Sequence, residues 1–97
     1  MFTLRLLARV PGEKRREFLE SLTALTAKEG GFCRKLLLKD VTDDTFYCWM
    51  GDCDSAAELE AFVSSDTFRA IRGAAQVLGT LEDVSIVEIR TGFFGDK

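Results

Sequence analysis

Hydrophobic and polar positions along the chain follow two different periods, and each period predicts one kind of element. Between Phe2 and Val10, apolar side chains occupy the even positions while Thr3, Arg5 and Arg9 occupy odd ones, which predicts a first strand that ends at Pro11-Gly12. From Glu13 onward the period becomes helical. The apolar residues at this spacing are Phe18, Leu22 and Leu25, and they predict a helix that ends at Gly30-Gly31.

A β-hairpin is predicted next. Segments 32–41 and 45–51 flank Thr42-Asp43-Asp44, whose short polar side chains suit a turn. In the second of these strands the run FYCWM leaves no polar face. Because successive strand residues point to opposite sides of a sheet, its residues divide into Phe46, Cys48 and Met50 on one face and Tyr47 and Trp49 on the other. Both faces of this strand therefore need to be covered.

The second half of the chain predicts helix and then strand. Ser55 and Glu58 have the spacing of a capping box, which places a helix start after the hairpin. Ser64-Ser65-Asp66 interrupts this helix, and Asp66 is able to cap a further helical stretch that ends at Gly79. Residues 83–91 then form a last strand, apolar on both faces.

The order strand, helix, two hairpin strands, helix, strand predicts one α+β domain over residues 1–97. This order matches a ferredoxin-like βαββαβ sandwich with a four-stranded antiparallel sheet. Its helices cover one face of the sheet and leave the other face open. Since that second face is apolar in FYCWM and in the last strand, we expect a second copy of the chain to cover it in a homodimer.

Composition narrows the classes of function. The chain has 97 residues, of which 46% are hydrophobic, and a formal net charge of -3, so nucleic acid and anionic membrane surfaces are not expected partners. No signal-like or membrane-spanning segment is expected. Three cysteines without metal-ligand spacing favour a reducing cytoplasm and no metal site. The absence of histidine removes the commonest general base.

Three runs in the second half resemble the antibiotic biosynthesis monooxygenase superfamily: Gly51-Asp52-Cys53-Asp54-Ser55, then residues 57–62, then residues 65–70. Members are small ferredoxin-like proteins of the dimeric α/β-barrel type, with a pocket between helices and sheet. The family includes cofactor-free oxygenases that act on quinols and anthrone-type polyaromatics, and haem-degrading enzymes. The resemblance therefore implies a cofactor-independent monooxygenase acting on a quinol- or anthrone-like substrate.

The chain departs from the polar residues of these relatives. Where quinol-type relatives have a tryptophan before the second helix it has Cys53, and where they have histidines it has Phe62 and Thr67. The asparagine, tryptophan and histidine of the haem-degrading branch fall on Arg5, Phe62 and Arg72, which disfavours that branch. These departures motivate an alternative function, a non-catalytic dimeric module that binds a small ligand or assembles.

Seven residues are candidates for a substrate pocket, and each has a second interpretation. Phe62 and Phe68 suit an aromatic pocket or a core helix, and Tyr47 and Trp49 suit a phenolic ligand or a dimer interface. The guanidinium groups of Arg5 and Arg72 suit the stabilisation of a developing oxyanion or a surface ion pair. The Cys53 thiol, which lies just before a predicted helix, is either activated by the helix dipole or buried and inert. The seven are Arg5, Tyr47, Trp49, Cys53, Phe62, Phe68 and Arg72. Since the sequence has no histidine, the candidates for a general base are Tyr47, Cys53 or an acidic residue.

Overall fold

A computed structural model describes residues 1–27 and 29–90 of the chain. The elements in chain order are β1 (Phe2–Arg9), the 3-10 turn η1 (Gly12–Lys14), α1 (Arg15–Thr26), β2 (Arg34–Lys39), β3 (Phe46–Cys53), α2 (Ala56–Val63), α3 (Asp66–Leu78) and β4 (Thr80–Glu88). The four strands form one antiparallel sheet in the order β2-β3-β1-β4. The α+β ferredoxin-like fold predicted from the sequence is confirmed.

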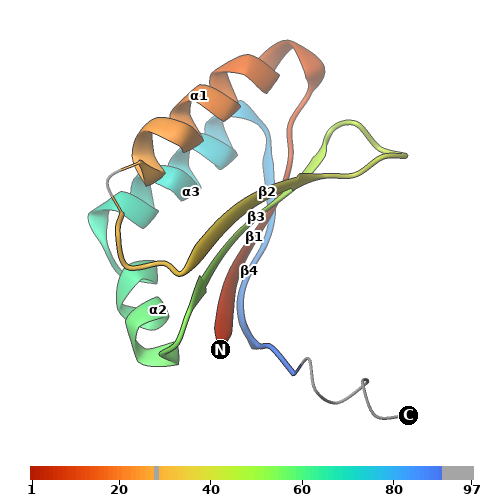
Figure 1. Ribbon diagram of the computed structural model, residues 1–97. Helices are drawn as coiled ribbons and strands as arrows, with labels where there is room; N and C mark the ends of the chain where they lie inside the picture. Colours follow the sequence, from red (N-terminus) through yellow and green to blue (C-terminus); the bar gives the residue numbers. More distant parts are fainter. Residues whose placement is uncertain (28, 91–97) are drawn as a thin grey trace, which may run out of the picture.

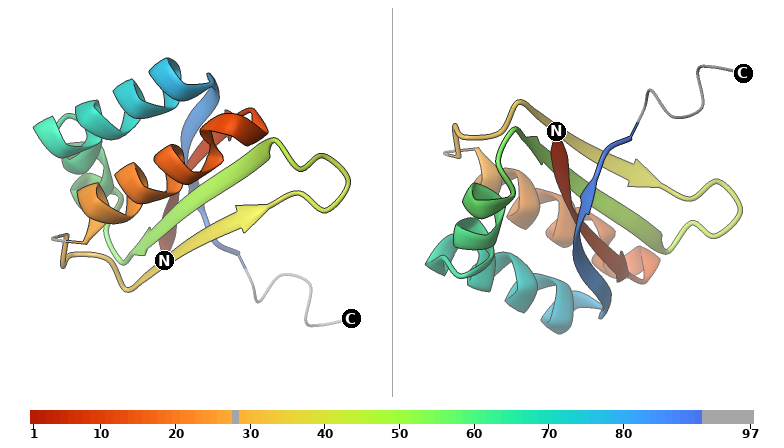
Figure 2. Two further views of the ribbon diagram at one scale, coloured as in Figure 1. Left: turned by 90° about the horizontal axis from the view of Figure 1, so that it is seen from above. Right: turned by 90° about the horizontal axis from the view of Figure 1, so that it is seen from below.

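All three α-helices lie on one side of the sheet, and no described helix covers the other side (Figure 1). Figure 2 shows the same layers from above and below, with the turn between β2 and β3 projecting beyond the helices. We call the uncovered side of the sheet the open face. No helix among the described residues is long and apolar enough to cross a membrane.

The alternation of FYCWM is confirmed. Tyr47 and Trp49 are each 3% exposed and face the helices, together with Leu4 and Leu6 of β1. The residues that alternate with Tyr47 and Trp49 point to the open face, namely Phe46, Cys48 and Met50. From the strand registers, the apolar side chains on this face are Leu7, Leu36, Leu38, Phe46, Cys48, Met50 and Val87. Each face of β3 therefore carries the residues that the sequence predicts.

The helix starts differ from prediction in one detail. Ser55 caps α2, its Oγ accepting a hydrogen bond from the backbone N–H of Glu58, as the capping-box spacing predicts. The cap of α3 is Ser65 rather than Asp66, and its Oγ accepts from the N–H of Phe68. Asp66 instead occupies the first turn of α3, where a carboxylate interacts favourably with the helix dipole.

Strand boundaries also differ from the sequence prediction. β4 begins at Thr80 rather than residue 83, and it ends at Glu88; the predicted end at Thr91 lies outside the described residues. The early start follows from Gly79, where α3 turns directly into β4 against β1. A Cβ at Gly79 would collide with the carbonyl oxygen of Arg9, so only glycine permits this close approach of the two backbones.

Candidate functional site

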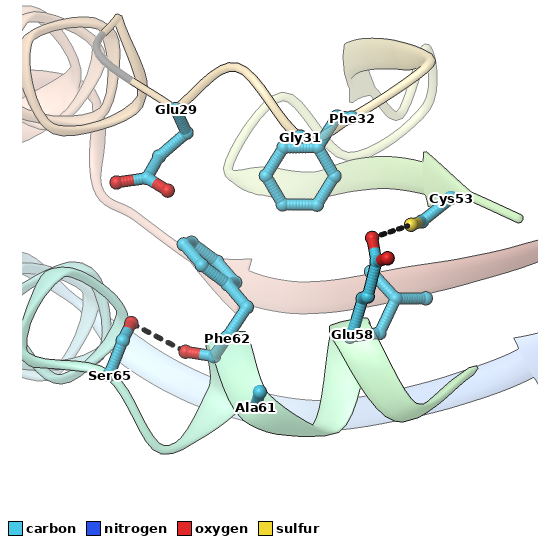
Figure 3. Close-up of a pocket in the computed structure, with 9 residues that line it drawn as sticks. Glu29, Gly31, Phe32, Cys53, Glu58, Ala61, Phe62 and Ser65 are labelled. Atoms are coloured by element: carbon cyan, nitrogen blue, oxygen red, sulfur yellow. Dashed lines mark hydrogen bonds between the residues drawn. The ribbon is translucent and has the colours of Figure 1, made fainter. Parts of the chain in front are cut away.

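A cavity of about 310 Å³ opens between α2 and the loop that joins α1 to β2. Its walls come from that loop, from the end of β3 and from α2, as Figure 3 shows. We call it the α2 pocket. It is lined by Glu29, Gly31, Phe32, Cys53, Glu58, Leu59, Ala61, Phe62 and Ser65.

Aromatic rings form one side of the α2 pocket and continue behind it. The Phe32 ring lies edge-on to Phe62, with centroids 5.1 Å apart, and edge-on to Trp49 at 5.7 Å. Phe62 in turn contacts Phe68, with centroids 5.5 Å apart. These separations are those of favourable edge-to-face pairs, so each ring fixes the next. The pocket wall is therefore continuous with the core.

Gly51 explains how a loop residue reaches this position. A Cβ at Gly51 would lie 2.7 Å from the Phe32 ring and 3.0 Å from the Trp49 ring. The missing side chain therefore leaves the space in which Phe32 packs on the sheet. A hydrogen bond from the Cys33 N–H to the Asp52 carbonyl, at 2.8 Å, holds the same loop against the end of β3.

Cys53 and Glu58 meet at the other side of the pocket. The Cys53 thiol donates a hydrogen bond to Glu58 Oε1 at 3.2 Å (Figure 3). In a complete capping box the glutamate side chain would turn back to the N–H of its own cap residue. Here the Glu58 side chain points to the thiol, so its carboxylate stands at the pocket rather than at the helix start.

The surroundings of Cys53 keep it protonated. A backbone hydrogen bond from Ser55 lowers the pKa of the Cys53 thiol. Burial, together with the hydrogen bond and the negative charge of Glu58, raises the pKa by more than this, so the net shift is upward. The residue Cys53 is 5% exposed. Of the two interpretations of Cys53, burial is what the structure shows, and the upward pKa shift, caused first by burial and then by Glu58, does not favour an activated thiol.

The polar groups of the α2 pocket are acceptors and weak donors. Two carboxylates, those of Glu29 and Glu58, line the pocket together with the Cys53 thiol and the Ser65 hydroxyl, and this hydroxyl donates to the Phe62 carbonyl at 2.6 Å. None of the described lining residues is a lysine or an arginine. The pocket can hold an aromatic ring and accept hydrogen bonds from it at carboxylate oxygens.

Four of the seven sequence candidates lie at or next to this pocket. Cys53 and Phe62 line it. Trp49 contacts the lining residue Phe32, and Phe68, which is fully buried, contacts the lining residue Phe62. Trp49 and Phe68 therefore support the wall from the core side.

The other three candidates lie elsewhere. Arg5 points to the open face, where its Nε donates to Ser85 Oγ at 3.3 Å. Tyr47 is buried beneath α1, with its ring 5.7 Å from that of Phe18. Arg72 lines an adjoining polar hollow with Arg69 on α3, and this hollow shares the lining residue Ser65 with the α2 pocket. Neither candidate arginine lines the α2 pocket.

Seven of the nine lining residues were not among the sequence candidates, and three of the seven matter most for the chemistry of the pocket: Glu29, Phe32 and Glu58. Glu58 was recognised only as part of a capping box, and its orientation depends on the thiol five positions earlier. Glu29 and Phe32 lie in a loop without periodicity. The one usable signal is Phe32 itself, a large aromatic residue directly after two glycines, since such a residue usually packs on something.

Known proteins match this chain in sequence pattern and in fold. A crystal structure of a conserved protein from Methanosarcina mazei has 18% identity and a TM-score of 0.77, with 92% of each chain covered. A variant of SnoaB, a cofactor-independent oxygenase from Streptomyces nogalater, has 22% identity and a TM-score of 0.74, again with 92% of each chain covered. A protein of unknown function from Bacteroides thetaiotaomicron has 22% identity and a TM-score of 0.74, covering 91% of this chain and 96% of that one.

Structural likeness at these identities establishes the fold alone. No curated protein matches the sequence. The family model described as antibiotic biosynthesis monooxygenase, however, matches residues 1–74, which include β1, α1, the hairpin, α2 and the first part of α3. Those residues supply every lining residue of the α2 pocket. The chain therefore belongs to the antibiotic biosynthesis monooxygenase family.

Proposed function

We propose that this chain is a cofactor-independent monooxygenase that oxidises an electron-rich aromatic substrate of the quinol or anthrone type in the α2 pocket. The observation that carries the proposal is the carboxylate of Glu58 standing beside the aromatic wall of Phe32 and Phe62. Family membership supports the reaction class. The pocket supports the substrate class, because an aromatic wall with hydrogen-bond acceptors suits a hydroxylated aromatic ring.

The chemistry needs a base and a dry site. In this proposal the Glu58 carboxylate accepts a proton from the bound substrate, and the resulting carbanion reacts with oxygen to give a hydroperoxide. For an anthrone, two C–H bonds of the methylene carbon are broken, one oxygen atom becomes the new carbonyl and the other leaves as water. The substrate supplies all the electrons, so the balance requires no further reductant. Phe32 and Phe62 position the ring.

Glu58 fills the place of the base better than the candidates from the sequence. Tyr47 lies under α1, and the raised pKa of the Cys53 thiol makes thiolate scarce at neutral pH. Cys53 instead occupies one oxygen of Glu58 with its hydrogen bond. In this proposal it is a positioning residue that orients the carboxylate.

One observation favours the second candidate function, a non-catalytic module that binds a small aromatic ligand. A carbanion and its oxygenated product carry developing negative charge, which oxygenases stabilise with hydrogen-bond donors or cations. The described lining residues include no basic side chain, and neither Arg5 nor Arg72 is among them. A binding module does not need such a group.

Oxygen consumption distinguishes the two functions. The protein is incubated with anthrone-like and menadiol-like substrates while oxygen uptake is followed, and the origin of the product oxygen is traced with labelled O₂. We expect uptake above the buffer rate, and at least a tenfold loss in the Glu58→Gln variant. Glu60→Gln is the matched control, because Glu60 lies on the same helix but does not line the pocket. Uptake equal to buffer for both substrates would reject the oxygenase and favour the binding module.

A further inference from the structure

The polar hollow beside the α2 pocket is a second cavity, which the proposed function does not use. We propose that this hollow binds the acidic group, a carboxylate or a phosphate, of an aromatic ligand whose ring lies in the α2 pocket. The inference rests on the proposed function only in taking the α2 pocket as the place of the ring. It goes further by assigning a second subsite with its own residues, and by giving the direction in which the ligand lies.

The hollow lies between the end of α2 and one side of α3, and we call it the arginine hollow. Its volume of about 330 Å³ is similar to that of the α2 pocket. Arg69, Arg72 and Gln76 are spaced three and four residues apart on α3, which puts their side chains on one side of the helix. The residues that line the hollow are Val63, Ser64, Ser65, Arg69, Arg72 and Gln76.

The arginine hollow has a charge opposite to that of the whole chain. The formal net charge of the chain is -3, yet none of the described residues that line this hollow is acidic. Its two guanidinium groups repel each other, because like charges three residues apart on a helix are neighbours. A bound anion offsets this repulsion. The guanidinium groups and the Gln76 amide are hydrogen-bond donors that suit carboxylate or phosphate oxygens.

Both arginines are available to a ligand. Within residues 1–27 and 29–90, Arg72 forms no ion pair. No acidic residue lies three or four positions from it on α3. Arg69 pairs with Asp66 at 3.0 Å, but both side chains are strongly exposed. Such an exposed pair contributes little to stability, so an anionic ligand can replace Asp66.

The arginine hollow and the α2 pocket meet at Ser65, which lines both. The last two residues of α2 are divided between them, since Phe62 lines the pocket and Val63 lines the hollow. Figure 3 shows Ser65 at one end of the pocket and the hydrogen-bonded pair of Cys53 and Glu58 at the other. A ligand that extends from the Glu58 end past Ser65 therefore enters the hollow.

The distances suit a short side chain on the ligand. Because an α-helix rises 1.5 Å per residue, Arg69 and Arg72 lie about 6 Å and about 10 Å beyond Ser65 along α3. Long side chains on a helix lean toward its N-terminus, which brings both guanidinium groups back toward Ser65. A chain of a few bonds between ring and acidic group is therefore long enough.

The charges of the two cavities determine which end of the ligand lies where. Glu29 and Glu58 line the α2 pocket, so an acidic group that stayed there would lie beside negative charges. In the arginine hollow the same group lies beside two positive charges. The acidic group therefore lies beyond Ser65, and the ring lies between Ser65 and Glu58, the base of the proposed function.

The test uses naphthalene probes that are not quinols, so binding is measured without turnover. One probe carries a propanoate side chain, the second carries the matching uncharged propanamide, and the third carries an ethyl phosphate. Isothermal titration calorimetry of the whole chain gives the three dissociation constants. At low salt we expect at least one acidic probe to bind at least fivefold more tightly than the propanamide, and the tighter of the two identifies the acidic group. This ratio should fall as sodium chloride is added, because salt screens exposed charges.

Substitutions assign the ratio to the arginine hollow. Arg72→Gln should reduce it at least threefold, and Gln76→Glu, which adds a carboxylate to the hollow, should abolish it. Arg16→Gln is the matched control, because Arg16 is an exposed arginine of α1 that lines neither cavity. It changes the net charge equally and should leave the ratio unchanged. Phe62→Leu should weaken all three probes alike, since Phe62 contacts only the ring.

The outcomes separate this inference from the proposed function. Three results would overturn the inference: no probe binds, the acidic probes bind no better than the propanamide, or Arg72→Gln and Arg16→Gln have equal effects. Selection for an acidic probe through Arg72, in a protein that consumes no oxygen with quinol or anthrone substrates, would support the inference and reject the oxygenase. Oxygen uptake without selection for an acidic group would do the reverse.

Discussion

At the scale of single residues, Cys53 and Glu58 share one hydrogen bond, so a change in one alters the other. The Glu58 carboxylate raises the pKa of the Cys53 thiol through this bond and through its negative charge. Glu58→Gln removes the charge, so the pKa of Cys53 should fall toward its ordinary value. The thiolate fraction at a given pH then increases, and alkylation by iodoacetamide should become several-fold faster between about pH 7 and 9.

Mass spectrometry of the separate cysteine peptides measures this change. Cys33 is exposed and serves as the internal control, because its rate should be the same in the variant and the unmodified chain. The pKa of Cys48 is raised by burial, an effect that Arg5 partly offsets, so its rate should also stay the same. A Cys53 rate unchanged by Glu58→Gln would show that the carboxylate does not control the thiol.

Tyr47 offers a second residue-scale prediction. Its hydroxyl is buried and has no hydrogen-bond partner among the described residues, although the ring packs on Phe18. A buried polar group without a partner destabilises the folded state, so Tyr47→Phe should raise the free energy of unfolding by about 1 kcal/mol. Urea denaturation measures the change. Tyr47→Leu is the comparison, because it removes the ring contact as well and should destabilise; a loss of stability in Tyr47→Phe would mean that the hydroxyl has a partner.

At the scale of elements, Ser65 connects α2 to α3. Its Oγ donates to the Phe62 carbonyl at the end of α2 and accepts from the Phe68 N–H at the start of α3. Ser65→Ala should lower the free energy of unfolding by about 1 kcal/mol, as the loss of a helix cap does. Thermal or urea unfolding checks this, and Ser64→Ala is the matched control, since that exposed residue is not the cap of α3. Equal effects of the two substitutions would contradict the capping role.

The elements were more predictable than the site, for a physical reason. Strand and helix periods depend on which side of each element is buried, and that information is repeated along β1, β3 and α3. The α2 pocket depends instead on single tertiary contacts. Phe32 reaches it because Gly51 leaves room for its ring, and Glu58 faces it because the Cys53 thiol holds its carboxylate. Neither contact leaves a repeated pattern in the sequence.

The contrast between repeated patterns and single tertiary contacts also explains why Arg5 and Arg72 were candidates although neither lines the α2 pocket. The position of Arg5 at an odd place in β1 already puts it on the face opposite Leu4 and Leu6, so its distance from the helix-side pocket follows from alternation. The position of Arg72 on α3 required knowing which side of that helix meets α2. Polar character suggested a site for both residues, and only the fold shows that neither lines the α2 pocket.

At the scale of the whole molecule, the open face is the feature that the single chain leaves without cover. Side chains of all four strands contribute to it, and Leu38 and Val87 are 48% and 38% exposed. Charged residues also lie here, including an ion pair between Arg34 and Asp52 at 2.9 Å. A sheet face of this kind, on which apolar side chains alternate with charged ones such as Arg5, suits an interface between two copies. The homodimer remains our proposal for what covers it.

Cys48 lies on the open face in β3, between β1 and β2, so substituting it gives the sharpest test of the homodimer. If sheets of two chains pack there, Cys48→Lys places an unpaired charge in the interface, and the protein should unfold or aggregate rather than form a stable monomer. Val77→Lys is the matched control, because Val77 is 81% exposed on α3 and lies away from that face; this variant should stay folded and dimeric. Circular dichroism measures whether each variant is folded, and analytical ultracentrifugation measures whether it is dimeric. A well-folded Cys48→Lys monomer, or an unmodified chain that sediments as a monomer at micromolar concentration, would reject the homodimer, because the open face would then be stable in water.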